Sequence, residues 1–502
     1  MIGNFTHGPG LDPAKASGGS NNGAFELAAM YDLLIHYNPE TAEFEPGTAE
    51  SLEPNDDYSE WTLRLRPGIR FTDGTPYDAN AVKFSIERLI NEGASTPRVI
   101  VNTFIGEVRV VDDLTVVFRS KIPWNGFPSI LSGIAGLVYS PTAFAKAGAD
   151  FNVNPGDAGA GPFKLAAYRP GESVELERNP EYWGGEVHLD RLKFISLPGA
   201  DLNLEAILAD TLHVAIARDP EVVARARDEG LTMIDLSGPA SNIILMNAGV
   251  DVTCNQGQPA NLCAGRADGE RVPTQTATRD VRVRQAVAHA VDPEVVNERV
   301  WGGQALAGSA PFANFRWDPG VPGPNHDPDE ARRLVEAAKA DGWDGTIRLI
   351  AGNDPQGSAW MQAIEPQLRG VGMNVQVDTT LTTQQVIAQV LVNRDYDLAL
   401  WSHGIPDDPY GAYTQLIGAF DSRQKRYGYG TPEMDAAIDS LRVAETDIER
   451  VEAFRRIGEL WVRDMPAAVI GVVPTAYMLN PDVHGVRRTG SAILVFDKAW
   501  IG

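Results

Sequence analysis

The segment "WTLRLRPGIRFTDGTPYDANAVKFSIERL", residues 61–89, passes from a strand through a turn into a helix. In its first part, apolar Trp61, Leu63 and Leu65 alternate with polar residues, which predicts a strand with one buried face. After the Pro-Gly turn, Asp78 is placed to cap a helix whose apolar residues share one face. The segment therefore predicts a chain that mixes strands and helices.

The same mixture continues along the chain. "EVRVVDDLTVVF", residues 107–118, predicts a β-hairpin turning at two aspartates. "DPDEARRLVEAAKADG", residues 327–342, predicts a helix with Asp327 at the N-cap and Glu330 at the capping-box position. Over 502 residues this alternation predicts an α/β protein of two or three lobes.

The composition is that of a globular protein, with 43% hydrophobic and 22% charged residues. The 67 acidic residues exceed the 43 basic ones and give a net charge of −24, which disfavours nucleic-acid binding. Solubility alone accounts for such acidity. The sequence has no apolar run long enough to span a membrane and no signal-peptide pattern at its start.

The two cysteines, Cys254 and Cys263, lie close together in a polar, Gly- and Pro-containing segment. One close pair in an otherwise cysteine-free chain predicts a local disulfide and an oxidising compartment. Two unpaired thiols are the alternative. The spacing does not suit a zinc knuckle.

Catalytic signatures are missing from the sequence. We find no GxGxxG, GxxxxGK[ST], HExxH or GxSxG motif, and none of the eight histidines lies three or four residues from another. We therefore expect a binding protein rather than an enzyme, without a cofactor or a bound metal.

Polar and aromatic residues gather in three loops that follow strands, at residues 6–23, 351–360 and 399–413. Ligands of open α/β sheets bind where strands end, and Trp and Tyr supply contact area there. For each aromatic residue, packing in the core is the alternative. With one asparagine from residues 244–249, the candidate ligand-binding residues are His7, Asn21, Asn22, Asn247, Asn353, Gln356, Trp360, Trp401, Ser402, His403, Asp407 and Tyr410.

Residues 30–89 resemble the signature region of extracytoplasmic solute-binding proteins of the peptide/nickel ABC-importer class. The shared pattern is a "P-x-x-AES" stretch, then "L-R-x-G-x-x-F-x-D-G-x-P", then a helix with "A-x-x-V-x-F-S-x-x-R". "GAGPFKLAAYRPGESVELERNPEYWGG" at 159–185 and "DVRVRQAVAHAVD" at 280–292 also resemble this family, in the same order.

The resemblance implies a two-lobed clamshell of the type II periplasmic-binding-protein class with an extra third domain. Closure about two hinges, near residues 244–249 and 474–480, would bury the ligand. The disulfide would lie in an insertion at about 250–279. The implied parts are a discontinuous lobe I (1–36, 159–239 and 475–502), an extra domain (37–158) and lobe II (240–474).

The resemblance also implies a function. The protein would capture a solute outside the cytoplasm, in the periplasm or at the cell surface, and deliver it to an ABC permease in the membrane. We expect a monomer whose export leader is absent from this chain, and a lipid anchor on a lost N-terminal cysteine is one alternative. A secreted hydrolase using Asp407 or Asp408, or a sensory or chaperone-like role, are the competing hypotheses.

The nature of the ligand is less defined, because two family features are missing. Peptide-binding members place an aspartate for the peptide amine three residues after a tryptophan, where this chain has Gly404 after Trp401. Asp408 better matches a structural Asp-Pro, and no arginine follows the "IRLI" strand to hold a carboxylate. A peptide or peptide-like solute remains the leading prediction, an oligosaccharide is the alternative, and nickel is disfavoured.

Two residues of this loop keep an alternative role. His403 either faces the ligand or is a hydrogen-bonded loop histidine. Asp407 either contacts the ligand or is an exposed turn residue or helix cap.

Overall fold

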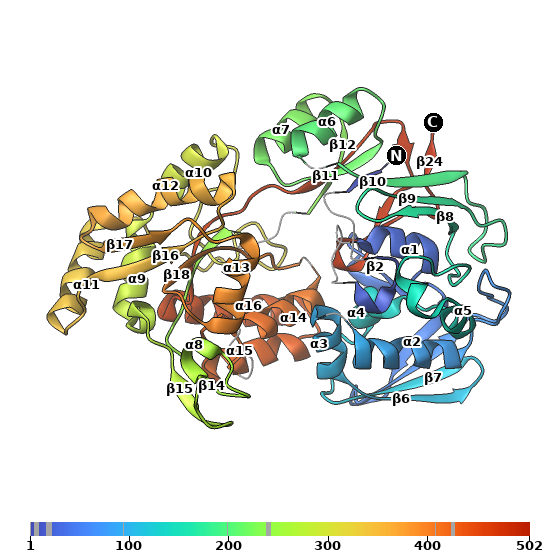
Figure 1. The fold of residues 1–502 in the computed structure, drawn as a ribbon, viewed down its shortest axis with the longest axis horizontal. Coiled ribbons are helices and arrows are strands. Elements are labelled where there is room, and N and C mark those ends of the chain that lie inside the picture. The colour runs from blue at the N-terminus through green and yellow to red at the C-terminus, as the bar shows by residue number, and fades with distance from the viewer. Residues whose placement is uncertain are drawn as a thin grey trace. The chain divides into compact units, whose positions relative to one another are not determined.

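The computed structural model describes residues 2–4, 10–16, 23–93, 95–197, 199–236, 242–406, 408–422 and 427–502. The chain divides into two compact units, the first formed by residues 1–218, 222–236 and 475–502 and the second by 219–221 and 237–474 (Figure 1). The finer division of the first unit into a lobe and an extra domain stays a prediction. Of the helices in the described residues, none has the length and apolar character needed to cross a membrane.

The main sheet of the first unit has seven strands in the order β12-β20-β11-β1-β10-β9-β8. β1 pairs in parallel with both β10 and β11, so these three strands end at the same edge. The strands are β1 (Ile2–Asn4), β8 (Phe163–Arg169), β9 (Ser173–Arg178), β10 (Arg191–Ser196), β11 (Val214–Ala217), β12 (Thr232–Asp235) and β20 (Ala476–Leu479).

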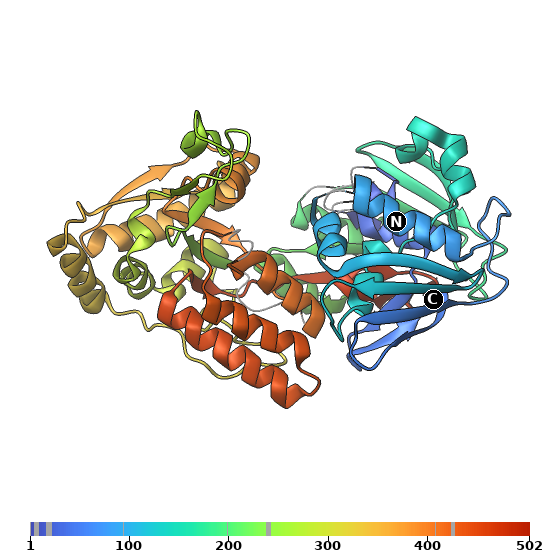
Figure 2. The same cartoon turned by 90° about the horizontal axis from the view of Figure 1, so that it is seen from below.

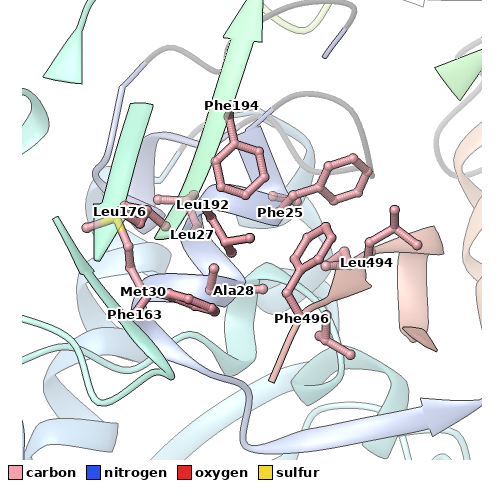
Figure 3. Packing of buried hydrophobic residues seen from close by; sticks show 14 of the residues in the cluster. Phe25, Leu27, Ala28, Met30, Phe163, Leu176, Leu192, Phe194, Leu494 and Phe496 are labelled. Atoms are coloured by element: carbon pink, nitrogen blue, oxygen red, sulfur yellow. The ribbon is translucent and has the colours of Figure 1, made fainter. Parts of the chain in front are cut away.

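Helix α1 (Phe25–Tyr31) forms the centre of the first unit, and all seven of its residues are buried. It packs against β8 and against β23 (Leu494–Val495), so the two ends of the chain share one core. Figure 3 shows this packing, in which Phe25 and Met30 of α1 lie among side chains of the main sheet and of the C-terminal segment. A helix buried on every side requires such covering from several elements.

A second sheet of the first unit contains the strand predicted at Trp61–Leu65. Its strand order is β4-β5-β7-β6, with β4 (Ala49–Pro54), β5 (Glu60–Leu65), β6 (Ile105–Asp112) and β7 (Thr115–Ser120). The predicted hairpin is confirmed as β6 and β7. Helix α2 (Ala79–Glu92) begins as predicted, since the Asp78 carboxylate accepts a hydrogen bond of 2.9 Å from the Ala81 N–H.

Shorter elements complete the first unit. They are β2 (Ile35–Asn38), β3 (Glu43–Pro46), α3 (Ser95–Phe104), α4 (Pro128–Leu131), α5 (Pro141–Ala147), α6 (Ala200–Leu208), α7 (Pro220–Asp228), β21 (Val483–His484), β22 (Arg487–Arg488) and β24 (Trp500–Ile501).

A buried ion pair joins α2 to the N-terminal segment. The Arg88 guanidinium donates two hydrogen bonds, of 2.7 and 2.6 Å, to the two carboxylate oxygens of Asp12, and both side chains are buried. It also donates to the Tyr139 hydroxyl at 3.0 Å and lies 4.2 Å from the centre of the Phe144 ring. Asp12 in turn caps the short 3₁₀ helix η1 (Pro13–Lys15). The pair therefore fixes the segment just before residues 17–22.

We expect Arg88→Leu to destabilise the first unit by about 3 to 5 kcal/mol, because it leaves the Asp12 carboxylate buried without its partner. Glu87→Gln on the same helix is the matched control. It removes the exposed Lys83–Glu87 pair and should cost less than about 1 kcal/mol. Urea unfolding of the three proteins measures both values, and equal losses in the two variants would contradict the role of the buried pair.

The second unit is built on a five-stranded sheet in the order β17-β16-β18-β13-β19. β16 is parallel to β17 and β18, while β13 is antiparallel to β18 and β19. Four strands therefore end at one edge, which we call the carboxyl edge, and β13 begins there. The strands are β13 (Asn242–Met246), β16 (Thr346–Ile350), β17 (Asn374–Asp378), β18 (Leu398–Ser402) and β19 (Ala467–Gly471).

Helices cover this sheet. α9 packs on α11 and α10 on α12 (Figure 1), and α14, α15 and α16 lie side by side, in orange-red in Figure 2. The helices are α8 (Ala260–Cys263), α9 (Val281–Ala290), α10 (Pro293–Trp301), α11 (Pro328–Ala340), α12 (Pro355–Gly370), α13 (Thr383–Ala388), α14 (Pro409–Phe420), α15 (Pro432–Val443) and α16 (Asp447–Asp464).

Of the predicted capping box of α11, the N-cap bonds are present and the return bond from Glu330 is not. Asp327 is the N-cap and accepts from the N–H groups of Asp329 and Glu330. The Glu330 carboxylate does not return to the cap, because it binds Arg333 while the Asp327 N–H donates to the His289 carbonyl. A tertiary contact thus replaces the local one.

The predicted disulfide is present between Cys254 and Cys263, whose Cα atoms are 5.4 Å apart. It closes an insertion that contains α8 and a hairpin of β14 (Asp251–Thr253) and β15 (Arg271–Pro273). The hinge expected near 244–249 is wrong, because residues 242–246 form the fully buried strand β13 and the chain changes units between 236 and 237.

Candidate functional site

Two of the three predicted loops meet the carboxyl edge of the second unit. The loop after β16 leads into α12, and the loop after β18 leads into α14. β13 begins at the same edge, since Asn242 is paired with Ser402 at the end of β18. The edge therefore gathers the loops that follow strands, as expected for a ligand site of an α/β sheet.

The loop after β16 presents amide side chains. Asn353 and Gln356 are exposed, and the Asn353 N–H donates to the Leu381 carbonyl at 2.8 Å, which ties this loop to the one after β17. The Asp354 carboxylate caps α12 by accepting from the Gly357 N–H at 2.9 Å. The loop thus offers neutral hydrogen-bonding groups, and its carboxylate is used within the fold.

Trp401, within β18, is paired with Tyr427, which follows α14. Trp401, half-buried near the end of β18, donates its indole N–H to the Tyr427 hydroxyl at 3.0 Å. The two rings meet edge to face with centroids 5.7 Å apart. This hydrogen bond fixes the plane of the Trp401 ring, while Ser402 beside it is exposed.

His403, two residues after Trp401, packs against aromatic rings and is only 4% exposed. The rings of Phe420 and Tyr427 stand nearly perpendicular to the imidazole, with centroids 5.6 and 5.5 Å away. Its Nδ1 lies 3.4 Å from the Tyr427 hydroxyl, and its Nε2 has no hydrogen-bond partner among the described residues. Burial lowers the pKa of His403 to about 4, so the ring is neutral at neutral pH.

Asp408 has a structural role, as interpreted from its Asp-Pro context. It is buried at the N-cap of α14, where its carboxylate accepts from the Gly411 N–H. A carboxylate engaged in this way is poorly placed to act as the acid or base of a hydrolase.

The sequence analysis missed Tyr427, and it also misread the role of Asn247. Asn247 lies beyond the far end of β13, fully buried, and donates to the carbonyls of Arg394 and Tyr396. A side chain at Gly428, whose φ is +71°, would clash with Asn247, because its Cβ would lie 2.7 Å from the Asn247 amide oxygen. The Tyr396 hydroxyl donates to the Tyr427 carbonyl at 2.9 Å. Asn247 thus supports the turn that positions Tyr427. In the sequence, the "YGYG" at 427–430 is the pattern that could have indicated this turn.

The other predicted residues fall elsewhere. Trp360 is only 6% exposed and packs edge to face with Trp301 in the hydrophobic core of the second unit. Its role is therefore core packing, the alternative to ligand contact given for each aromatic residue. His7, Asn21, Asn22 and Asp407 lie outside the described residues, as does the side chain of Tyr410. The structure therefore brings Asn353, Gln356, Trp401, Ser402 and His403 to the carboxyl edge.

Comparison with known families decides the broad class. The sequence model of the bacterial extracellular solute-binding proteins, family 5, middle region, matches residues 43–424. The chain belongs to this family. Its predicted character as an extracytoplasmic solute-binding protein, and not an enzyme, is confirmed by that membership.

Individual relatives of the chain have low sequence identity to it. The glutathione-binding protein GsiB of Pectobacterium atrosepticum is 27% identical over 352 residues, which cover 68% of this chain and 62% of that protein. Di/tripeptide-binding protein 2 of Pseudomonas aeruginosa is 24% identical over 488 residues, covering 91% of this chain and 86% of that protein.

A solved structure shows the same fold. The crystal structure of NikA from Brucella suis in complex with Fe(III)-EDTA matches with a TM-score of 0.77 and 22% identity, over 100% of this chain and 99% of that one. The predicted type II periplasmic-binding-protein fold is confirmed. In the described part of this family 5 protein, no three His, Cys, Asp or Glu side chains gather as a metal site would require.

The buried imidazole makes a prediction about pH. Between about pH 6.5 and pH 4 the unfolded chain binds a proton at His403 and the folded chain does not. Its contribution to stability is therefore complete above pH 6.5 and falls by about 2 to 3 kcal/mol by pH 4.5. His403→Phe should reduce the difference in unfolding free energy between pH 7 and pH 4.5 by that amount.

Urea unfolding at the two pH values measures this difference. His188→Gln, at an exposed histidine beside Glu186, is the control and should leave the difference unchanged. A wild-type pH dependence retained in full by His403→Phe would show that the imidazole is not held neutral.

Proposed function

We propose that this protein is the substrate-binding component of an ABC importer and that its solute is a peptide or peptide-like molecule. The importer role follows from membership of the family, and the peptide class is supported by the names of the two relatives described above. We also propose that it acts as a monomer with membrane permease subunits as partners, with or without a lipid anchor.

The observation that carries the peptide class is the neutral character of the carboxyl edge. The side chains of Asn353, Gln356, Ser402 and His403 carry no charge at neutral pH, the half-buried Trp401 lies at the same edge, and the carboxylates of Asp354 and Asp408 there cap helices. A peptide backbone is bound through uncharged donors and acceptors, and an aromatic ring adds contact area without demanding one side chain. The edge therefore suits a ligand read through its backbone rather than through its terminal charges.

An oligosaccharide is the second candidate, and the fixed plane of Trp401 favours it. A tryptophan ring held by its own N–H presents a flat apolar surface, and Asn and Gln side chains beside it can bond hydroxyl groups. The mass of the bound ligand distinguishes a peptide from an oligosaccharide.

The deciding experiment is native mass spectrometry of the freshly purified protein, followed by release and mass analysis of any bound molecule. A set of peptide masses would support the proposal, whereas a series spaced by hexose units would replace it with a sugar-binding function. An empty protein that no peptide or sugar stabilises thermally, but that turns over peptides or glycosides, would contradict both candidates.

We expect Trp401→Ala to weaken binding of the released ligand about tenfold or more, because it removes a half-buried aromatic ring from the edge. Trp343→Ala is the matched control. Trp343 is also half-buried with a bonded indole N–H, 2.9 Å from the Thr346 carbonyl, but it lies at the opposite end of β16. Calorimetric titration of both variants measures the effect, and equal losses would place the ligand elsewhere.

A further inference from the structure

The imidazole of His403 is the polar group of the carboxyl edge that the fold leaves incomplete. It is 4% exposed, and its Nε2 has no partner among the described residues. A buried polar group without a partner costs about 1 to 3 kcal/mol. A phenylalanine at this position would pack against Phe420 and Tyr427 without that cost, so the nitrogen calls for a functional explanation.

The neighbouring hydrogen bonds bear on which nitrogen carries the proton. An indole N–H can only donate, so the Tyr427 oxygen is the acceptor in its 3.0 Å contact with Trp401. The Tyr427 hydroxyl can then donate its own proton to His403 Nδ1, 3.4 Å away, and the reverse arrangement, in which Nδ1–H donates to the same oxygen, is the alternative tested below. With Nδ1 as the acceptor, the single proton of the neutral imidazole lies on Nε2.

The ring stays neutral because of its surroundings. Among the described residues, burial is the cause that lowers its pKa. The nearest carboxylate along the chain in the described residues, that of Asp408, is engaged at the cap of α14. His403 is therefore a neutral donor, not a cation.

We propose that the Trp401–Tyr427–His403 chain holds His403 as the Nε2–H tautomer and that this N–H donates to a carbonyl or carboxylate oxygen of the bound peptide. This inference rests on the proposed function and adds a specificity-determining residue to it. A peptide ammonium group has only donors and finds no acceptor at this nitrogen. The peptide is thus placed with an acceptor oxygen, and not with its amino group, at His403.

The tautomer is tested first, in the free protein, by ¹⁵N NMR of the histidine-labelled full chain. The signals of His403 are assigned by their loss in His403→Gln. We expect a protonated Nε2 and an unprotonated, accepting Nδ1, and a loss of this preference in Tyr427→Phe. Tyr429→Phe is the matched control, since that hydroxyl donates to Asp464 at 2.7 Å while its ring also contacts Phe420. A protonated Nδ1 in the wild type overturns the inference.

Binding is tested second, with a tryptic digest of casein as the probe and mass spectrometry of the retained peptides. One neutral hydrogen bond corresponds to a loss of affinity of up to about tenfold. We expect that loss in His403→Phe, which keeps the ring, and a smaller one in His403→Gln, which keeps an N–H donor. Thermal unfolding confirms that each variant is folded.

The outcomes separate the two proposals. Wild-type protein that retains no peptide overturns the proposed peptide function, while the tautomer in the free protein still decides the hydrogen-bond chain. Peptide retention that is equal in the wild type and in folded His403→Phe overturns the inference alone.

Discussion

Two of the connections between the units, the one before β13 and the one after β19, join the five-stranded sheet of the second unit at its carboxyl edge. β13 begins there with Asn242, and β19 ends there with Gly471, which is paired with Asn242. On the side of the first unit these two connections are held together by a hydrogen bond of 2.7 Å from the Leu236 N–H to the Thr475 carbonyl. The loops that follow β16 and β18 leave the sheet at the edge where β13 begins and β19 ends.

At the carboxyl edge, the carboxylates of Asp354 and Asp408 have structural roles, and the groups proposed for recognition are uncharged. Asp354 and Asp408 each cap a helix, which satisfies backbone N–H groups that would otherwise be unpaired. Trp401, Tyr427 and His403 are joined by hydrogen bonds among uncharged groups in apolar surroundings. An arrangement of this kind can accept ligands that differ in side chains and terminal groups, because no fixed charge must be matched.

Much of the fold could be predicted because its signals are local. The Asp78 cap, the hairpin of β6 and β7 and the disulfide each depend on residues close together in sequence. Contacts between distant residues gave no such signal. Arg88 and Asp12 are 76 residues apart, and their pairing cannot be read from either segment alone. The same limit explains the missed capping contact of Asp327, whose N–H is taken by His289 from another helix.

The candidate site shows the same limit. Trp401 and His403 could be found because they follow a recognisable strand, whereas Tyr427 lies 26 residues from Trp401 in a turn with no periodic pattern. Trp360 occurs in a loop-to-helix segment rich in polar residues, yet it faces the core, because helical position and not composition decides which side is buried. Asn247 looked like a ligand contact because of its place near a supposed hinge, and its burial under Gly428 could not be foreseen.

The disulfide-closed insertion joins the second unit at the end of the sheet opposite the carboxyl edge. The Thr276 hydroxyl donates to Asp397, just before β18, and the Thr278 hydroxyl donates to the Asn247 carbonyl, just after β13. These anchors bond to positions where the strands are already fixed in register by their neighbours. Both anchoring threonines follow the disulfide-closed hairpin, so the length or sequence of that hairpin can change without breaking either bond. This hairpin is accordingly a position where the surface of the second unit can vary while the register of β13 and β18 is kept.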